Sequence, residues 1–377
     1  MTAGAGHRRA AEALAQAAKS RWPQATVECL DVLTCAPSWF RAGYAWSYLF
    51  LVRHLSWIWK FSYCALDAGS FYRLVQPLRR AWNAFIVRAF VEQLKADPPD
   101  MILTTHFLPT NVCATGKAAG WLSAPLVVVV TDLHPHWFWV EPASDAVVVA
   151  TPESARVCEQ RGIAPGKIHV LGIPIGAAFT FTPDRDALRT QLGVMPNRQT
   201  ILVTSGGTTI GHFELVVESL IALEQEMPSQ LQLLVVCGED AGARERLLKR
   251  AHTSPMPLNV FGFIDNMAEL MAVSDLAVAK AGGLTVSEAL GRTLPLVLYH
   301  IIPGQEQMNA QYLADHGAGL IAHGAHEVAQ TVRDCIRDPQ RLARMREAAK
   351  QLSHPHAADE IMAQVVQPLL ESVVHSP

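Results

Sequence analysis

The stretch that decides the fold is DLAVAKAGGLTVSEALGRTLPLVLYH, residues 275–300. A short apolar run ends in a glycine pair, an apolar helical stretch follows, and a second apolar run begins at Leu294. Short continuous apolar runs joined by a helix are typical of parallel strands that are buried on both faces. The stretch therefore predicts a strand, a crossover helix and a parallel neighbouring strand.

The same pattern recurs in both halves of the chain, and it predicts an α/β protein with two sheets covered by helices. The Pro/Gly-rich stretch from Pro174 to Pro183 is the predicted linker. We expect one domain over residues 1–180 and another over 181–377, and whether the C-terminal helix packs back on the first domain is left open. The other predicted strands are 101–107, 124–132, 145–152, 199–207, 231–240 and 258–263.

Composition narrows the class of protein. The chain has 377 residues, 50% of them hydrophobic and 17% charged, which is enough apolar material for two cores. Residues 1–180 carry 16 Lys and Arg against 12 Asp and Glu, an excess too small for nucleic acid but suited to anionic lipid. Seven cysteines without ligand spacing favour neither a disulfide framework nor a zinc site, and the absence of a signal-peptide pattern favours the cytoplasm.

The segment from Trp39 to Tyr63 is the most lipid-like part of the sequence. Its charge-free run is too short to span a bilayer, which takes about 20 apolar residues. Aromatic rings interleaved with cations suit the headgroup layer of a membrane, and the alternative is an apolar cap inside the protein. The predicted membrane or acceptor residues are Trp39, Trp46, Arg53, Trp57, Trp59 and Lys60.

Glycine-rich turns are the first places to look for chemistry, because ligands of open α/β sheets bind beyond the carboxyl ends of the strands. In SGGTTIGH (205–212), Gly206 and Gly207 would let a diphosphate approach the backbone, or they form a tight turn without a ligand. In KAGGLTVSEAL (280–290), Thr285 and Glu288 are either a helix capping box or, through Glu288, a site for ribose hydroxyls. Gln305, Glu306 and Asn309 follow the last strand and could bind sugar hydroxyls, or they form an ordinary polar helix start.

The motif TDLHPHWFW (131–139) places Asp132, His134 and His136 directly after a predicted strand. An aspartate there could act as a general base. The two histidines raise the possibility of a metal, but the spacing offers no third ligand, so we predict no metal site.

Taken together, these residues resemble a known family. GAGHRRAAEAL (4–14), VVVTDLHPHWF (128–138), SGGTTIGH and the block from Val260 to Gly319 are similar to the monogalactosyldiacylglycerol synthases and the bacterial diacylglycerol glucosyltransferases, relatives of the peptidoglycan N-acetylglucosaminyltransferase. The resemblance implies two Rossmann-like lobes facing a cleft (GT-B type) and an inverting, metal-independent transfer of a hexose from a UDP-sugar to diacylglycerol or a similar lipid. It implies no cofactor, and it places the protein peripherally on the inner face of the cell membrane.

The resemblance also assigns site residues. His7 matches a glycine-histidine loop over the active site and Asp132 a proposed base, so that one removes the acceptor proton and the other orients the acceptor. Gly206 and Gly207 would face the diphosphate, and Phe263 with Ile264 would hold uracil. The remaining donor-binding residues would be Gly282, Gly283 and Thr285 for the phosphates, Glu288 for the ribose, and Gln305 and Glu306, with Asn309 beside them, for the hexose.

The sequence departs from the family in two places. Members have an apolar strand before the glycine-histidine loop, whereas here only Met1 and Thr2 stand in its place, so we expect a start codon further upstream or a first lobe that lacks a strand. The loop SGGTTIGH is also less rich in glycine. Two other functions stay open: an isomerase similar to UDP-N-acetylglucosamine 2-epimerases, and a catalytically inactive lipid-binding relative. The choice between galactose and glucose is not determined.

Overall fold

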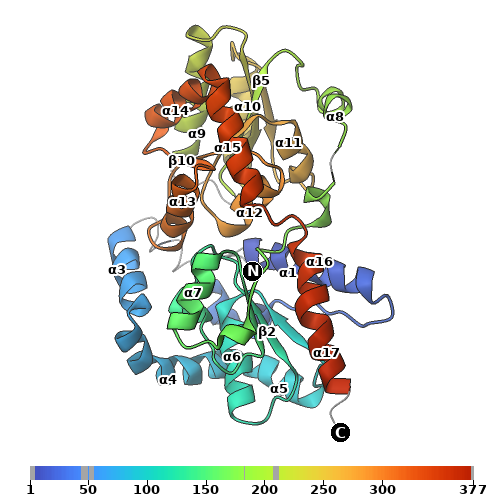
Figure 1. The fold of residues 1–377 in the computed structure, drawn as a ribbon. Helices are drawn as coiled ribbons and strands as arrows, with labels where there is room; N and C mark the ends of the chain where they lie inside the picture. Colours follow the sequence, from blue (N-terminus) through green and yellow to red (C-terminus); the bar gives the residue numbers. More distant parts are fainter. Residues whose placement is uncertain (1–4, 44–49, 51–54, 182, 207–211, 375–377) are drawn as a thin grey trace. The chain divides into compact units, whose positions relative to one another are not determined.

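The computed structural model describes residues 5–43, 50, 55–181, 183–206 and 212–374. They form two compact units, each built around a parallel sheet (Figure 1). Unit 1 comprises residues 1–176, 302–305 and 356–377, and unit 2 comprises residues 177–301 and 306–355. The predicted α/β class with two parallel sheets is confirmed.

The sheet of unit 1 has four strands in the order β1-β2-β3-β4. The strands are β1 (Ile102–Thr104), β2 (Leu126–Val129), β3 (Ala146–Val149) and β4 (Ile168–Val170). The helices are α1 (Ala5–Arg21), α3 (Ser56–Asp67), α4 (Gly69–Ile86), α5 (Arg88–Ala96), α6 (Phe107–Ala118), α7 (Pro152–Gln160), α16 (Ala357–Ile361) and α17 (Gln367–Val374), with shorter turns η1 (Val32–Cys35), η2 (Trp137–Trp139), η3 (Pro165–Lys167) and η6 (Met362–Val366).

Alternate residues of β2 and β3 pack against different helices, as the two-residue period of a strand requires. Val127 and Val148 face α1 and the returning helices α16 and α17, together with η6. Val128 and Val147 face α5 and α6 on the other side. Both faces of the sheet are thus covered, which is why these strands read as unbroken apolar runs.

On its other side from β2, β1 forms the edge of the sheet and pairs with no further strand among the described residues. The extended segment between α1 and η1, residues 26–31, forms no strand either, although it alternates apolar and polar residues.

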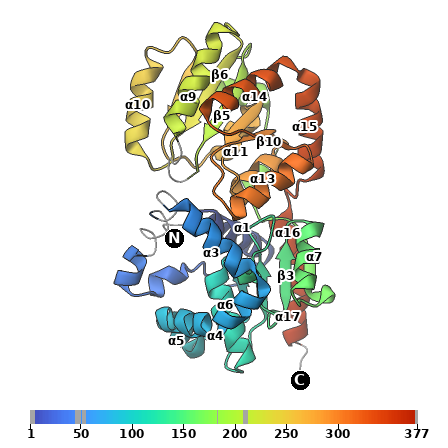
Figure 2. The ribbon, with the colours of Figure 1, turned by 90° about the vertical axis from the view of Figure 1, so that its left-hand side faces the viewer.

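Unit 2 has a six-stranded sheet in the order β10-β9-β8-β5-β6-β7. Figure 2 labels β5, β6 and β10 of this sheet. The strands are β5 (Gln199–Thr204), β6 (Leu231–Val236), β7 (Leu258–Phe261), β8 (Leu276–Ala279), β9 (Leu296–Leu298) and β10 (Gly319–Ile321). The helices are α8 (Arg185–Gln191), α9 (Phe213–Ile221), α10 (Ala241–Ala251), α11 (Met267–Val273), α12 (Gly283–Gly291), α13 (Gln305–Asp315), α14 (Ala325–Arg337) and α15 (Pro339–Gln351), with turns η4 (Ala177–Phe179) and η5 (Ala222–Gln225).

One large core lies between this sheet and the helices α9 and α14. Ile201, Val203, Val278 and Val297 point into it from three neighbouring strands, and Val332 of α14 covers them. All five side chains are fully buried. The opposite face carries the other half of the alternating strand residues, so β5 and β8 are buried on both sides.

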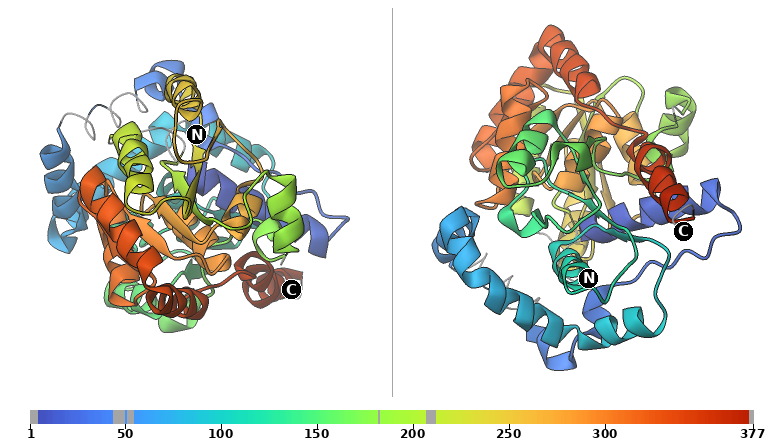
Figure 3. Two further views of the ribbon diagram at one scale, coloured as in Figure 1. Left: turned by 90° about the horizontal axis from the view of Figure 1, so that it is seen from above. Right: turned by 60° about the horizontal axis from the view of Figure 1, so that its bottom comes forward.

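The helices α3 and α4 lie on the outside of unit 1, next to α6 and η2 (Figure 3). A buried carboxylate, Glu141, fixes α4: Arg80 donates to it at 2.8 Å, Asn111 of α6 at 2.6 Å, and Arg79 lies 3.6 Å away. A buried charge is tolerated when it is paired and hydrogen-bonded in this way. Within the described residues, no helix combines the length and the apolar character needed to cross a bilayer.

Candidate active site

The predicted residues of unit 1 gather where β1 and β2 end. Asp132 follows β2, and His7 lies in the first turn of α1, more than a hundred residues away in sequence. The His7 Nδ1 atom is 2.6 Å from the hydroxyl of Thr131, and the hydroxyl of Thr105 donates to the His7 carbonyl at 2.8 Å. Two threonines from two strand ends therefore fix both the backbone and the ring of His7.

The imidazole of His7 is neutral at pH 7. Burial lowers its pKa to about 4, which outweighs the opposite effect of a hydrogen bond to the Thr105 backbone. The Thr131 hydroxyl also lies 3.5 Å from the Thr105 carbonyl and can donate to it. In that arrangement the His7 Nδ1–H donates to Thr131, and the lone pair stands on Nε2, ready to accept a hydrogen bond.

Asp132 is 4% exposed, and two side chains donate hydrogen bonds to its carboxylate. The indole Nε1 of Trp139 donates to Oδ2 at 3.2 Å, and the side-chain amide of Gln305 donates to Oδ1. The ring of Trp139 also lies beside His7, with 6.1 Å between centroids. Asp132, His7 and Trp139 thus form one cluster in unit 1.

The two histidines that follow Asp132 are His134 and His136, and the contacts of His136 hold the local backbone. The ring of His136 caps η2, because its Nδ1 accepts from the Phe138 amide at 3.1 Å, while its Nε2 lies 3.1 Å from the Tyr63 carbonyl. Burial lowers the pKa of both His134 and His136. Across the described part of the chain, no three His, Cys, Asp or Glu side chains are gathered as metal ligands.

In unit 2, the predicted donor residues follow the carboxyl ends of β5, β7 and β8. Gly206 adopts a φ of +79°, which favours glycine, and its amide donates to Thr204 Oγ1 at 3.3 Å. Phe263, 52% exposed, and Ile264 lie between β7 and α11. All of these positions are strand ends, as the sequence predicts, and their roles stay predictions.

The predicted capping box of Thr285 and Glu288 is wrong. Gly282 is the N-cap of α12, and it has no side chain to accept a hydrogen bond, so Thr285 lies inside the first turn. Glu288 is 4% exposed within the same helix. Asn309 is fully buried on α13 and donates to the Ala281 carbonyl at 2.9 Å, which ties α13 to the turn after β8.

The predicted membrane residues are described only in part. Trp39 is 60% exposed, and Trp57 on α3 is 69% exposed. Trp46, Arg53 and Gly207 lie outside the described residues, and so do the side chains of Trp59 and Lys60.

Several residues near the site were not predicted. Thr105, Thr131 and Trp139 position His7 and Asp132, and Lys280 and Tyr299 lie beside the donor-side turns. Their signal in the sequence is position alone, because each lies near the end of a predicted strand or, for Trp139, in the loop that follows one.

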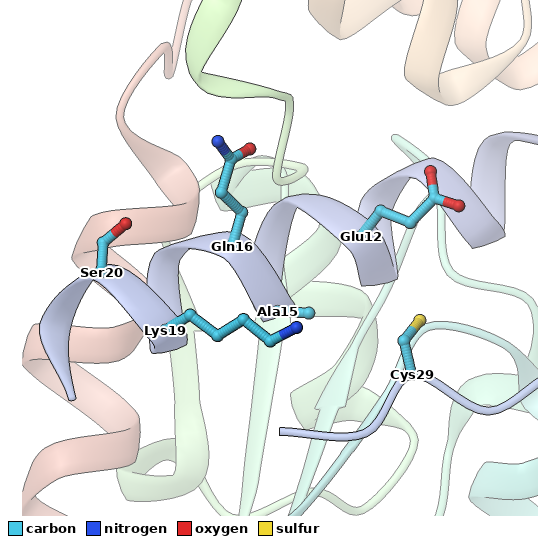
Figure 4. A pocket seen from close by; sticks show the side chains of 6 residues that line it. All are labelled: Glu12, Ala15, Gln16, Lys19, Ser20 and Cys29. Atoms are coloured by element: carbon cyan, nitrogen blue, oxygen red, sulfur yellow. The ribbon is translucent and has the colours of Figure 1, made fainter. Parts of the chain in front are cut away.

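A hollow of about 480 Å³ lies along α1 and against Cys29 (Figure 4). It contains none of the predicted site residues. Its lining residues are Glu12, Ala15, Gln16, Lys19, Ser20 and Cys29.

Comparisons with known proteins show which families and folds the chain is similar to. The family model for monogalactosyldiacylglycerol (MGDG) synthase matches residues 7–175, and the model for the glycosyltransferase family 28 C-terminal domain matches residues 200–361. MurG of Acinetobacter baumannii is similar in structure, with a TM-score of 0.57, 19% identity and coverage of 77% of this chain and 79% of that chain. MnaA of S. aureus, solved with UDP, has a TM-score of 0.61, 16% identity and coverage of 80% and 84%. These two structures support the fold alone.

Sequence relatives identify the family. The processive diacylglycerol beta-glucosyltransferase of Bacillus cereus is 30% identical over 270 residues, which are 71% of this chain and 68% of the relative. That of Bacillus thuringiensis is 29% identical over 275 residues, 73% of this chain and 69% of the relative. The resemblance seen in the sequence is confirmed. The chain belongs to the glycosyltransferase family that includes the monogalactosyldiacylglycerol synthases and the processive diacylglycerol glucosyltransferases.

Proposed function

We propose that this glycosyltransferase moves a hexose from a UDP-sugar to diacylglycerol or a similar lipid, with inversion at the sugar and without a catalytic metal. The observation that carries the proposal is the cluster of His7 and Asp132 at the strand ends of unit 1, in a chain whose relatives are named for diacylglycerol. The metal-independent and inverting course comes from the resemblance to the family.

The acceptor hydroxyl must lose its proton as the sugar bond forms. We assign Asp132 as the base, acting directly or through His7. His7 is neutral at pH 7 and orients the acceptor hydroxyl through the lone pair on Nε2. The supporting geometry is the bond from His7 Nδ1 to Thr131, which fixes the ring.

The donor residues belong to unit 2 apart from Gln305, which groups with unit 1. The turns at Gly206 and at Gly282–Gly283 and the first turn of α12 would face the diphosphate, because amides at a helix start attract anions. Phe263 and Ile264 would hold uracil, Glu288 the ribose, and Gln305 and Glu306 the hexose. Their positions after parallel strands support this assignment.

We further propose that α4 docks on a lipid surface. On its inward side Arg79 and Arg80 lie on Glu141, beside the buried Tyr72 and Ile86, whereas its outward side is apolar. Leu74 and Leu78 are each 76% exposed. A helix that faces water normally exposes its cations and buries its large apolar residues, and α4 does the opposite. Such an arrangement fits the interface of a bilayer. The α4 apolar face comprises Phe71, Leu74, Leu78, Trp82 and Phe85.

The charge of the surrounding segment favours an anionic membrane. Between residues 39 and 95 the sequence has eight cationic side chains and two acidic ones. Two of the cations, Arg79 and Arg80, pair inward with Glu141, and the others supply the excess of positive charge. Basic residues near a bilayer surface are attracted by anionic headgroups, at roughly 1 kcal/mol each. This supports a peripheral location on the inner face of the cell membrane. The cations are Arg41, Arg53, Lys60, Arg73, Arg79, Arg80, Arg88 and Lys95, and the acids are Asp67 and Glu92.

The test measures UDP release on liposomes with and without diacylglycerol, with UDP-glucose and UDP-galactose offered separately. We expect release that depends on diacylglycerol and a β-linked glycolipid product by NMR. Conversion of UDP-N-acetylglucosamine to its 2-epimer without lipid would instead support an isomerase. Liposome binding without any UDP release would support an inactive lipid-binding relative.

A further inference from the structure

Three neighbouring strands of unit 2 end in the same polar row. Val203 of β5 pairs with Val278 of β8, and Val278 pairs with Val297 of β9. Ser205, Lys280 and Tyr299 come two residues later, just beyond the ends of β5, β8 and β9. The Tyr299 amide donates to the Ala279 carbonyl at 3.1 Å, which continues the pairing of β9 with β8 past the strand end. Since side chains two residues apart share a face of a sheet, this row continues the apolar row below it.

Two hydroxyl groups of this row are buried without a hydrogen-bond partner among the described residues. Ser205 is 0% exposed and Tyr299 is 1% exposed. Among the described residues, neither hydroxyl oxygen has a hydrogen-bond partner. A buried hydroxyl without a partner costs about 1–3 kcal/mol, so two neighbouring ones at a strand end point to a bound group that is polar.

Lys280 adds a cation to this row. A Cβ atom at Gly206 would lie 3.7 Å from the Lys280 Cε and 3.9 Å from its Nζ, so the ammonium group lies at the turn that follows β5. Burial lowers the pKa of Lys280, and the charge of Glu306 partly opposes this. A bound anion would favour the charged form of the amine and so raise its pKa.

We propose that Lys280, with the hydroxyls of Ser205 and Tyr299, binds the diphosphate of the sugar nucleotide. An ammonium group and two hydroxyls supply hydrogen-bond donors, and phosphate oxygens are acceptors. Of the three residues, Lys280 lies just before α12, which begins at Gly283. The same contacts stabilise the charge that develops on the departing UDP as the sugar bond breaks. This inference rests on the proposed UDP-sugar donor.

The experiment measures the affinity of the full-length protein for UDP, UMP and uridine by calorimetry. Lys280→Met should weaken UDP binding by at least about tenfold, the usual loss for a hydrogen bond to a charged group, and leave uridine binding unchanged. Lys280→Arg should recover most of the UDP affinity. Ser205→Ala and Tyr299→Phe should each weaken UDP several-fold. The matched control is Lys249→Met, which removes an exposed lysine of α10.

Uridine binding shows that each variant is folded, so a specific loss of UDP supports the inference. Equal UDP affinity in Lys280→Met and in the unaltered protein would overturn it while leaving the donor proposal intact. If the unaltered protein binds neither UDP nor uridine, the proposed UDP-sugar donor is wrong and the inference is wrong with it.

Discussion

The carboxylate of Asp132 lies where the β2 strand ends. It is buried, and it accepts hydrogen bonds from neighbouring side chains. Trp139 and Gln305 each donate to one of its oxygens. Charged hydrogen bonds of this kind fix the direction of a carboxylate as well as its charge. The side chain is therefore oriented before any acceptor arrives, which is what a base that acts on a positioned hydroxyl requires.

Replacing Asp132 with Asn keeps the shape of the side chain and removes its basicity. We expect kcat for lipid glycosylation to fall by about 100-fold or more, because that is the usual contribution of a general base. The affinity for UDP should stay unchanged. Steady-state UDP release and calorimetry check both values. Asp97→Asn, at an exposed position, is the control, and a variant Asp132→Asn with full activity would remove Asp132 from the role of base.

His7 makes the stability of the protein depend on pH. Its pKa is about 4 in the folded protein and about 6.5 when unfolded. As the pH falls from 6.5 towards 4, the unfolded chain therefore gains a proton that the folded protein does not, and the free energy of unfolding decreases.

The variant His7→Gln lacks this proton uptake. Between pH 7 and pH 5, the melting temperature of the unaltered protein should therefore fall more than that of the variant. Thermal unfolding at the two pH values measures the difference. Parallel falls in both proteins would mean that His7 is charged, or solvated, in the folded state.

At the scale of elements, α4 shows that a helix can turn charged residues inward and expose apolar ones. Its arginines point to Glu141, while the α4 apolar face is left in solvent. Each leucine buried in lipid contributes about 1.5–3 kcal/mol. Two adjacent exposed leucines are therefore enough to decide whether the protein stays on a vesicle.

The double variant Leu74→Ser with Leu78→Ser should bind vesicles of anionic phospholipid at least about tenfold more weakly, by the same estimate. Binding of UDP should not change. Flotation of vesicles gives the partition coefficient. Leu248→Ser, at an exposed leucine of α10, is the control, and equal flotation of the double variant would exclude the α4 apolar face as the docking surface.

The elements that could be predicted are those whose signal is local. The eight predicted strands contain β1, β2, β3 and β5 to β9. The strands β4 and β10 were missed because their residues are mostly half-buried and because His169 and Gly319 interrupt the apolar pattern of a buried strand. The capping box was wrong because the glycine pair lets α12 begin one turn earlier.

The residues of the candidate site also differ in how far they could be predicted from local sequence. Asp132 and the glycine turns could be predicted because they follow strong apolar runs. The approach of His7 to Thr131, and the common row of Ser205, Lys280 and Tyr299, depend on which strands are neighbours. Strand order is a tertiary property, so no window of the sequence contains it.

At the scale of the whole molecule, the two cores are separate. Ile361 of α16 is fully buried against α1 and the sheet of unit 1, whereas Val332 of α14 is fully buried in the core of unit 2. A change in one core should therefore leave the other folded.

Ile361→Asp places a charge in the core of unit 1, which costs several kcal/mol. We expect it to abolish transfer to lipid while UDP affinity stays within about twofold, a change of less than about 0.5 kcal/mol. The reciprocal variant, Val332→Asp, should abolish UDP binding. Calorimetry with UDP and the transfer assay separate the two. Loss of UDP binding in both variants would show that the units fold as one.

The return of α16 and α17 to unit 1 has a consequence for synthesis on the ribosome. These helices and η6 cover Val127 and Val148, yet residues 356–377 are translated after all of unit 2. During translation the part of that face that α1 does not cover stays open to water while residues 177–355 emerge. Since domains fold as their sequence becomes available, unit 2, the later of the two to begin, is the first to be complete.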